Sequence, residues 1–402
     1  MALPQDFSRC RLLLAGLGLL AGALWLSGCG GGSGGGGAAT TPPVTSVANQ
    51  GQFKGATLIK TVSATDITAA MAQGGVPASV ASPRYAVNAY KLSYLTIDAQ
   101  GKEVLASALV AVPQKPANAL SPMISYQHGT IKLDAQAPSY LADPAAPELI
   151  MASLGYIVLS ADYVGYGLSK GVSHPYLLSA PSAAAVIDML TAAKTWRQAQ
   201  GVLDNKQLFL AGYSEGAYVT MATHRALQAG NFAHAQGLVS AVLGAGPYDV
   251  SFVLDELLKI VAQQYPLLGA TLKPGLLKLL SAADRNNVRD ALLKEIMGSN
   301  ADVTFVPTFL DNFFADDALA IDSQSNVNHW LPQVPVHLYH GRDDLTVPYL
   351  ASSNTLQWMQ AAGAGSRVSL TDCPAQPAGH LACVLPYWSF MLATFASDAR
   401  DL

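Results

Sequence analysis

The chain has 402 residues, of which 50% are hydrophobic and only 12% are charged, and its formal net charge is −4. A chain of this length can form one large domain or two of ordinary size. The small net charge and the lack of a strong basic run exclude the usual electrostatic pattern of a nucleic-acid-binding protein. Aromatic residues spread along the whole chain exclude wholesale disorder.

The N-terminus has the pattern of an export signal. Two arginines precede an apolar run from Leu12 to Leu26, which is shorter than the roughly 20 residues that a membrane-spanning helix needs. The run ends in the sequence LSGC, which resembles the lipobox of bacterial lipoproteins, whose cysteine becomes the lipidated first residue. We therefore expect residues 1–28 to be a lipoprotein signal peptide and Cys29 to carry the lipid. An ordinary cleaved signal, with no role for Cys29, is the alternative.

The segment that follows has the composition of a tether. An acyl chain on Cys29 would hold an exported protein at a bacterial membrane, on its periplasmic or cell-surface face, without a spanning helix. Residues 29–52 consist of a glycine tract and a polar, proline-containing stretch, a composition typical of flexible linkers. The folded body is expected to run from 53 to 402.

Short apolar strands alternate with helical segments through most of this body. The stretch 85–113 predicts two strands joined by a hairpin turn at Asp-Ala-Gln-Gly. Further strands are predicted at 122–128, 155–167 (running into a glycine-rich loop), 207–214, 237–246, 334–341 and 367–373, and helices at 182–199, 215–229 and 353–364. Because the later strands are apolar throughout, the alternation predicts an α/β fold with a mostly parallel sheet covered by helices on both faces.

One block interrupts the alternation. Residues from 251 to about 325 are rich in leucine and helical in pattern. They form either an inserted helical cap or a set of extra helices that only add packing.

The sequence Gly-Tyr-Ser-Glu-Gly places Ser214 between a predicted strand and a predicted helix. It matches the G-x-S-x-G pattern, in which a sharp strand-to-helix turn exposes a serine hydroxyl above the sheet. Small residues flank the serine because the strand and the helix approach closely there. Short matches of this kind also arise by chance, so the interpretation depends on finding the partners of the serine elsewhere in the chain.

A serine hydroxyl needs a base, and the base needs a third group to orient it. In this arrangement the acid and then the histidine follow the serine, each after a later strand. Asp344 follows the strand at 334–341 and His380 follows the strand at 367–373, so we predict a triad of Ser214, Asp344 and His380. Asp343 and Asp249 are the alternative acids.

Two backbone N–H groups are expected to stabilise the oxyanion. One belongs to Glu215, the residue after the serine. The other is expected in the loop that follows an early strand, where SYQHGT offers Thr130 first and Gly129 in reserve. The ring of His128 is expected to have a structural role.

Two of the four cysteines remain in the body, Cys373 and Cys383. In an oxidising compartment an even pair favours a disulfide, which would restrain the loop that carries His380. Two free thiols or a metal pair are the alternatives, but no matching ligand spacing supports a metal.

From about residue 85 to 395 the chain resembles an α/β-hydrolase. The stretches SYQHGT, ADYVGYGLS, HPYL, GYSEGAY and HGRDDLTVP are similar to the secretory lipase family, which has yeast and bacterial members. The resemblance implies hydrolysis of carboxylic esters by a serine, without a metal or an organic cofactor, and an inserted helical cap. Many members of the family carry glycine in place of Glu215, so a carboxylate beside the nucleophile is a departure that would disfavour anionic substrates.

Several other polar residues lie in loops near the predicted site. A structural role is favoured for those in the glycine-rich loop into which the predicted strand at 155–167 runs. A packing or loop role is favoured for those beside the strand at 334–341. These residues are Asp162, Tyr163, Tyr166 and His174 in the first group, and His337 and His340 in the second.

Together these features predict a membrane-tethered serine esterase or lipase. Its substrate would be a small-molecule or lipid ester, with an apolar acyl or aryl group suggested by the leucine-rich cap, and no nucleic-acid partner is expected. A serine peptidase of the prolyl-oligopeptidase type has the same order of triad residues and is one alternative. A non-enzymatic surface lipoprotein with a hydrolase fold is the other.

Overall fold

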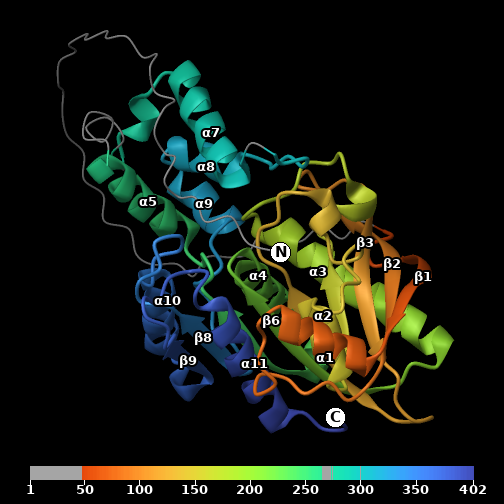
Figure 1. The fold of residues 1–402 in the computed structure, drawn as a ribbon. Coiled ribbons are helices and arrows are strands. Elements are labelled where there is room, and N and C mark those ends of the chain that lie inside the picture. The colour runs from red at the N-terminus through yellow and green to blue at the C-terminus, as the bar shows by residue number, and fades with distance from the viewer. Residues whose placement is uncertain (1–47, 265–272, 274, 299) are drawn as a thin grey trace, which may run out of the picture. The chain divides into compact units, whose positions relative to one another are not determined.

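The computed structural model describes residues 48–264, 273, 275–298 and 300–402 (Figure 1). The predicted signal peptide, Cys29 and most of the predicted tether lie outside these ranges. Within them, none of the helices combines the length and the apolar character that a membrane crossing requires. The last tether residues already contact the body, since the N–H of Gly51 donates to the carbonyl of Leu95 at 2.9 Å.

The body is organised around a single nine-stranded sheet in the order β1-β2-β3-β5-β4-β6-β7-β8-β9. The pairs β1–β2, β2–β3 and β3–β5 are antiparallel. The pairs β5–β4, β4–β6, β6–β7, β7–β8 and β8–β9 are parallel. The strands are β1 (Phe53–Val62), β2 (Val87–Ile97), β3 (Glu103–Pro113), β4 (Ser121–Gln127), β5 (Ile157–Ala161), β6 (Asp204–Tyr213), β7 (Leu238–Gly244), β8 (Val336–His340) and β9 (Val368–Asp372).

Helices cover both faces of the sheet (Figure 1). The helices are α1 (Ala64–Gln73), α2 (Pro147–Ser153), α3 (Ser179–Gln200), α4 (Glu215–Ala229), α5 (Val250–Gln264), α7 (Ala282–Met297), α8 (Thr308–Phe314), α9 (Ala318–Gln324), α10 (Leu350–Ala361) and α11 (Val384–Asp398). Alternate residues of β3 point to opposite faces, so Ala108 packs in the cluster that contains α3 and α4, and Leu109 in the cluster that contains α1, α2 and α11. This period of two is what a strand buried on both faces requires.

The predicted α/β architecture is confirmed, and the predicted strands correspond to β2 through β9. The strand β1 and the helices α1, α2 and α11 were not predicted. The strand β1 lies at the edge of the sheet with most of its residues exposed or half-buried, so it lacks the apolar alternation that identifies a strand in a sequence.

Helices α5, α7, α8 and α9 occupy the predicted helical block between β7 and β8. Their ends are tied to the body by buried hydrogen bonds. The hydroxyl of Tyr218 on α4 donates to the carbonyl of Ser325 at 2.7 Å, and the N–H of Val250 donates to the side chain of Asn326 at 2.8 Å. Both ends of the inserted block are thereby fixed to one another and to α4.

The predicted disulfide between Cys373 and Cys383 is present, with a Cα–Cα distance of 5.9 Å. It joins the residue after β9 to the residue before α11. The loop that it closes contains His380, so the disulfide limits the conformations open to that loop.

Candidate active site

Ser214 stands at the junction of β6 and α4 in a strained backbone conformation, with φ 58° and ψ −124°. A positive φ is uncommon for a residue that has a Cβ, and it persists only when surrounding contacts impose it. One such contact is the N–H of Ser214, which donates to the carbonyl of Gly244 at the end of β7 at 2.8 Å. The strain turns the chain sharply from strand to helix, which is the geometry that the G-x-S-x-G pattern predicts.

The two glycines of the pattern allow this turn to pack. A Cβ on Gly216 would lie 2.0 Å from the carbonyl oxygen of Gln127 on β4, and a Cβ on Gly212 would lie 2.2 Å from the carbonyl oxygen of Gly216. Real Cβ atoms do not approach backbone oxygens this closely, and the contacts are with backbone that cannot rotate away. Only glycine therefore fits at either position.

The structure brings Ser214, His380 and Asp344 together. The Nε2 atom of His380 lies 2.9 Å from the Oγ atom of Ser214, and its Nδ1 atom lies 2.6 Å from Oδ2 of Asp344. The three residues come from three separate places in the chain, namely the end of β6, the loop after β9 and the loop after β8. This is the chain of hydrogen bonds by which a base can take a proton from a serine hydroxyl.

The loop of His380 is held from several sides. The hydroxyl of Tyr213 donates to the carbonyl of His380 at 2.7 Å, and the carboxylate of Asp343 accepts from the N–H of Ala378 at 2.8 Å. Asp343, the neighbouring alternative for the acid, thus bonds to the backbone of this loop, whereas Asp344 makes the contact with the His380 ring. Asp249 accepts from Ser251 and Phe252 at the start of α5.

Asp344 is buried and surrounded by donors. Its Oδ1 atom accepts from the N–H groups of Thr346 and Val347, both at 2.9 Å. Its Oδ2 atom lies 3.3 Å from Nε2 of His340 in addition to its contact with His380. Burial alone would raise the pKa of Asp344, but the hydrogen bonds from the two histidines and from Val347, together with the charge of His380, outweigh it and hold the pKa well below its usual range. Asp344 is therefore a carboxylate that only accepts hydrogen bonds.

The contact of His340 with Asp344 was not predicted from the sequence. His340 is the last residue of β8, and its ring is fully buried, with Nδ1 2.7 Å from the hydroxyl of Ser352 and Nε2 2.9 Å from the carbonyl of Val347. A carbonyl only accepts, so Nε2 carries a proton that it shares with Asp344. Its position at the carboxyl end of the strand that leads to the acid was the only sequence signal for this role.

The loop after β4 passes beside the serine. A Cβ on Gly129 would lie 3.7 Å from the Cβ of Ser214 and 3.3 Å from the carbonyl oxygen of Tyr213, so the backbone of this loop is close to the serine. The side chain of the next residue, Thr130, lies 3.2 Å from the hydroxyl of Tyr176. On the other side, Glu215 is the first residue of α4, so its N–H has no partner within the helix and stands at the positive end of the helix dipole.

Aromatic side chains contact the loop after β4 and bond to its backbone. His128 stacks on Tyr163 with ring centroids 4.1 Å apart, and burial lowers its pKa, which favours the neutral ring. The hydroxyl of Tyr163 donates to the carbonyl of His128 at 3.1 Å, and that of Tyr166 to the carbonyl of Ile131 at 2.8 Å. Asp162 accepts from the side chains of Ser107 and Ser139.

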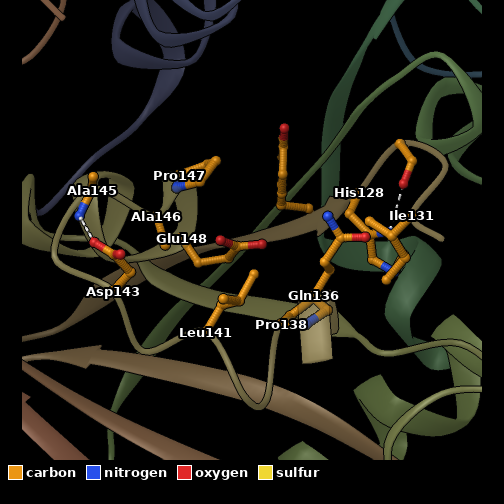
Figure 2. Close-up of a pocket in the computed structure, with 12 residues that line it drawn as sticks. His128, Ile131, Gln136, Pro138, Leu141, Asp143, Ala145, Ala146, Pro147 and Glu148 are labelled. Carbon is orange, nitrogen blue, oxygen red and sulfur yellow. Dashed lines mark hydrogen bonds between the residues drawn. The ribbon is translucent and has the colours of Figure 1, made fainter. Parts of the chain in front are cut away.

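A cavity of about 350 Å³ lies beside the loop after β4, and His128 and Gly129 form part of the cavity wall (Figure 2). The other side chains at its wall are mainly apolar: Ile131, Pro138, Leu141, Ala145, Ala146 and Pro147. Figure 2 also shows the carboxyl of Glu148 and the amide of Gln136 among them. Burial raises the pKa of Glu148, which favours its uncharged form.

No cluster of three or more histidine, cysteine or acidic side chains with the geometry of a metal site occurs among the described residues. The structure brings together a serine, a histidine, a carboxylate and two nearby backbone segments. These are the parts of a serine-dependent α/β-hydrolase.

Residues 148–386 match the model of the secretory lipase family. The match spans more than half of the chain, and the chain belongs to this family. Membership makes the protein a carboxylic ester hydrolase of the esterase and lipase class. No curated protein sequence matches the chain.

Several solved structures share its fold. The rice cell wall degrading esterase LipA from Xanthomonas oryzae is 24% identical with a TM-score of 0.65, and the match covers 87% of this chain and 98% of that one. A putative hydrolase from Legionella pneumophila is 20% identical with a TM-score of 0.67 and coverages of 86% and 97%. Candida antarctica lipase A in its closed state is 18% identical with a TM-score of 0.56 and coverages of 88% and 84%.

The environment of Asp344 predicts a pH dependence of stability. Because its pKa is lower in the folded protein than the value of about 3.9 in an unfolded chain, its contribution is fully present above about pH 4 and is lost as the pH falls toward the folded pKa. Between about pH 4.5 and 2.5 the free energy of unfolding should therefore fall more steeply in the wild type than in Asp344→Asn, by up to about 1.4 kcal/mol per pH unit.

Denaturant titrations at several pH values measure this difference. The exposed Asp66 on α1 provides the control variant Asp66→Asn, which removes a surface carboxylate and should follow the wild-type curve. Parallel curves for Asp344→Asn and the wild type would contradict the prediction.

Proposed function

We propose that the protein hydrolyses carboxylic esters through an acyl-enzyme intermediate on Ser214. The observation that carries the proposal is the position of His380, with Nε2 2.9 Å from Oγ of Ser214 and Nδ1 2.6 Å from Oδ2 of Asp344. Because Asp344 is ionised and only accepts, Nδ1 of His380 donates to it. The Nε2 atom is then unprotonated and accepts the hydrogen of the serine hydroxyl.

Acylation follows from this arrangement. As Oγ of Ser214 attacks the ester carbonyl carbon, its proton passes to Nε2 of His380, and Asp344 stabilises the resulting imidazolium. The carbonyl oxygen becomes an oxyanion, which accepts hydrogen bonds from the backbone N–H groups of Glu215 and Thr130. Collapse of the intermediate breaks the bond to the leaving oxygen, which takes the proton from His380 and departs as the alcohol.

Deacylation repeats the same steps with water. His380 takes a proton from the water as the water oxygen attacks the acyl carbon. The second tetrahedral intermediate collapses, Ser214 leaves with the proton from His380, and the carboxylic acid is released. No metal or organic cofactor takes part in either half-reaction.

The surroundings of the site favour an apolar ester. Leu345 directly follows Asp344 and is 77% exposed, and Leu381 directly follows His380 and is 71% exposed. These two exposed leucines put apolar surface on the loops that carry the acid and the base. An acyl or aryl group without charge is therefore the proposed substrate class, and a lipid ester belongs to it.

The protein is further proposed to act outside the cytoplasm, anchored to a bacterial membrane through a lipid on Cys29. The support is the sequence: an apolar run of export-signal length that ends in LSGC, followed by a glycine-rich tether. The secretory character of the family agrees with export.

Hydrolysis of p-nitrophenyl esters from acetate to palmitate tests the proposed reaction. We expect turnover by the wild type and a loss of about 10⁴-fold or more in Ser214→Ala. The exposed Ser397→Ala on α11 provides a matched serine control that should retain wild-type rates. A folded wild type that cleaves no ester would contradict the proposal, and cleavage of peptide p-nitroanilides alone would favour the peptidase alternative.

Metabolic labelling of producing cells with a fatty-acid analogue tests the anchor. We expect label on the full-length protein and on Ser214→Ala but none on Cys29→Ser, which should also leave the membrane fraction. Labelling of Cys29→Ser at the wild-type level would contradict the anchor without affecting the proposed reaction.

A further inference from the structure

The carboxylate of Glu215, directly beside Ser214, is buried against a histidine from a distant part of the chain. Its Oε1 atom lies 2.7 Å from Nε2 of His174, and both side chains are 2% exposed. A lone charge at such depth would destabilise the fold. The histidine thus supplies the partner that a buried carboxyl at this position requires.

The hydrogen bonds fix how many protons the pair holds. The Nδ1 atom of His174 lies 2.8 Å from the carbonyl oxygen of Val164, and since a carbonyl only accepts, Nδ1 carries a proton. The contact between His174 and Glu215 then contains one further proton, whether it sits on nitrogen or on oxygen. Either way the pair has no net charge, so Glu215 does not present the unpaired negative charge that its sequence position suggested.

The backbone of His174 is bound to the inserted helical block. Its N–H donates to the carbonyl of Thr304 at 2.7 Å, and its carbonyl accepts from the N–H of Val306 at 2.8 Å, which together form an isolated parallel bridge with Phe305. The ring of His174 lies 5.2 Å from that of Phe305, centroid to centroid. One residue thus holds the segment 304–306 with its backbone and the first residue of α4 with its side chain.

We propose that the His174–Glu215 pair positions the nucleophile turn, setting the direction of the Glu215 N–H toward the oxyanion. The inference rests on the proposed function, because it assigns this N–H to the oxyanion site. The side chain and the N–H of Glu215 share one Cα, so a side chain locked at both ends restricts the rotation of the peptide that carries the N–H. His174 and Glu215 act as positioning residues and do not touch the substrate.

Two variants of similar size separate positioning from packing. Glu215→Met fills the same volume but removes the hydrogen bond, and Glu215→Gln keeps a polar end that can donate to the neutral ring of His174. Thr223→Val is the matched control, since it also replaces a buried polar group of α4 by an apolar one, but its hydroxyl has no hydrogen-bond partner among the described residues.

The measurement is kcat and KM for a short p-nitrophenyl ester, expressed per active site titrated with a phosphonate ester, so that unfolded protein does not contribute. We expect kcat to fall about 10-fold to 100-fold in Glu215→Met with KM changed less than about threefold, because a misdirected oxyanion donor acts on the transition state. Glu215→Gln should recover kcat to within about threefold of the wild type, and Thr223→Val should retain it.

Two results would overturn the inference. One is a kcat per titrated site for Glu215→Met within about twofold of the wild type, which would leave the pair a purely structural role. The other is an equal loss in Glu215→Gln and Glu215→Met. An active wild type with either result would overturn this inference alone, whereas a wild type that neither turns over ester nor reacts with the phosphonate would overturn the proposed function and the inference with it.

Discussion

The site depends on one backbone constraint, the positive φ of Ser214 between β6 and α4. The turn exists because Gly216 lies against the carbonyl of Gln127 with no space for a Cβ, so β4, β6 and α4 meet at a single point. The turn points the hydroxyl of Ser214 toward His380. It also leaves the first N–H of α4 without a partner inside the helix. The strain is offset by the packing of a sheet that is buried on both faces.

The buried polar groups around this turn form hydrogen bonds that connect it to distant loops. Asp344 connects His380 to His340 and to the start of the loop after β8. Tyr213, one residue before the serine, holds the backbone of His380, and Glu215, one residue after it, reaches His174. Tyr213 and Ser214 are thus both joined to His380, and Glu215 is joined to His174. These bonds fix the serine relative to the histidine although they are far apart in sequence.

Much of this was readable from the sequence because it depends on local rules. A strand, a Gly-flanked serine and a helix, followed by an acid and a histidine after later strands, predicted the elements and the residues that meet. The edge strand β1 and the contacts of His340 and of His174 with carboxylates could not be predicted. Each depends on tertiary packing: an exposed strand has no apolar period, and nothing in the order of residues indicates that position 174 faces position 215.

The central claim is that Ser214 is a nucleophile activated by His380, and covalent trapping tests it most directly. A p-nitrophenyl phosphonate ester transfers its phosphonyl group to the serine of a serine hydrolase, and water does not release that group. It should liberate one equivalent of p-nitrophenol from the wild type. Mass spectrometry of the digested protein should then place the phosphonyl group on Ser214, and His380→Ala should remain unlabelled on the same time scale. A label on another residue, or none on folded wild-type protein, would contradict the account.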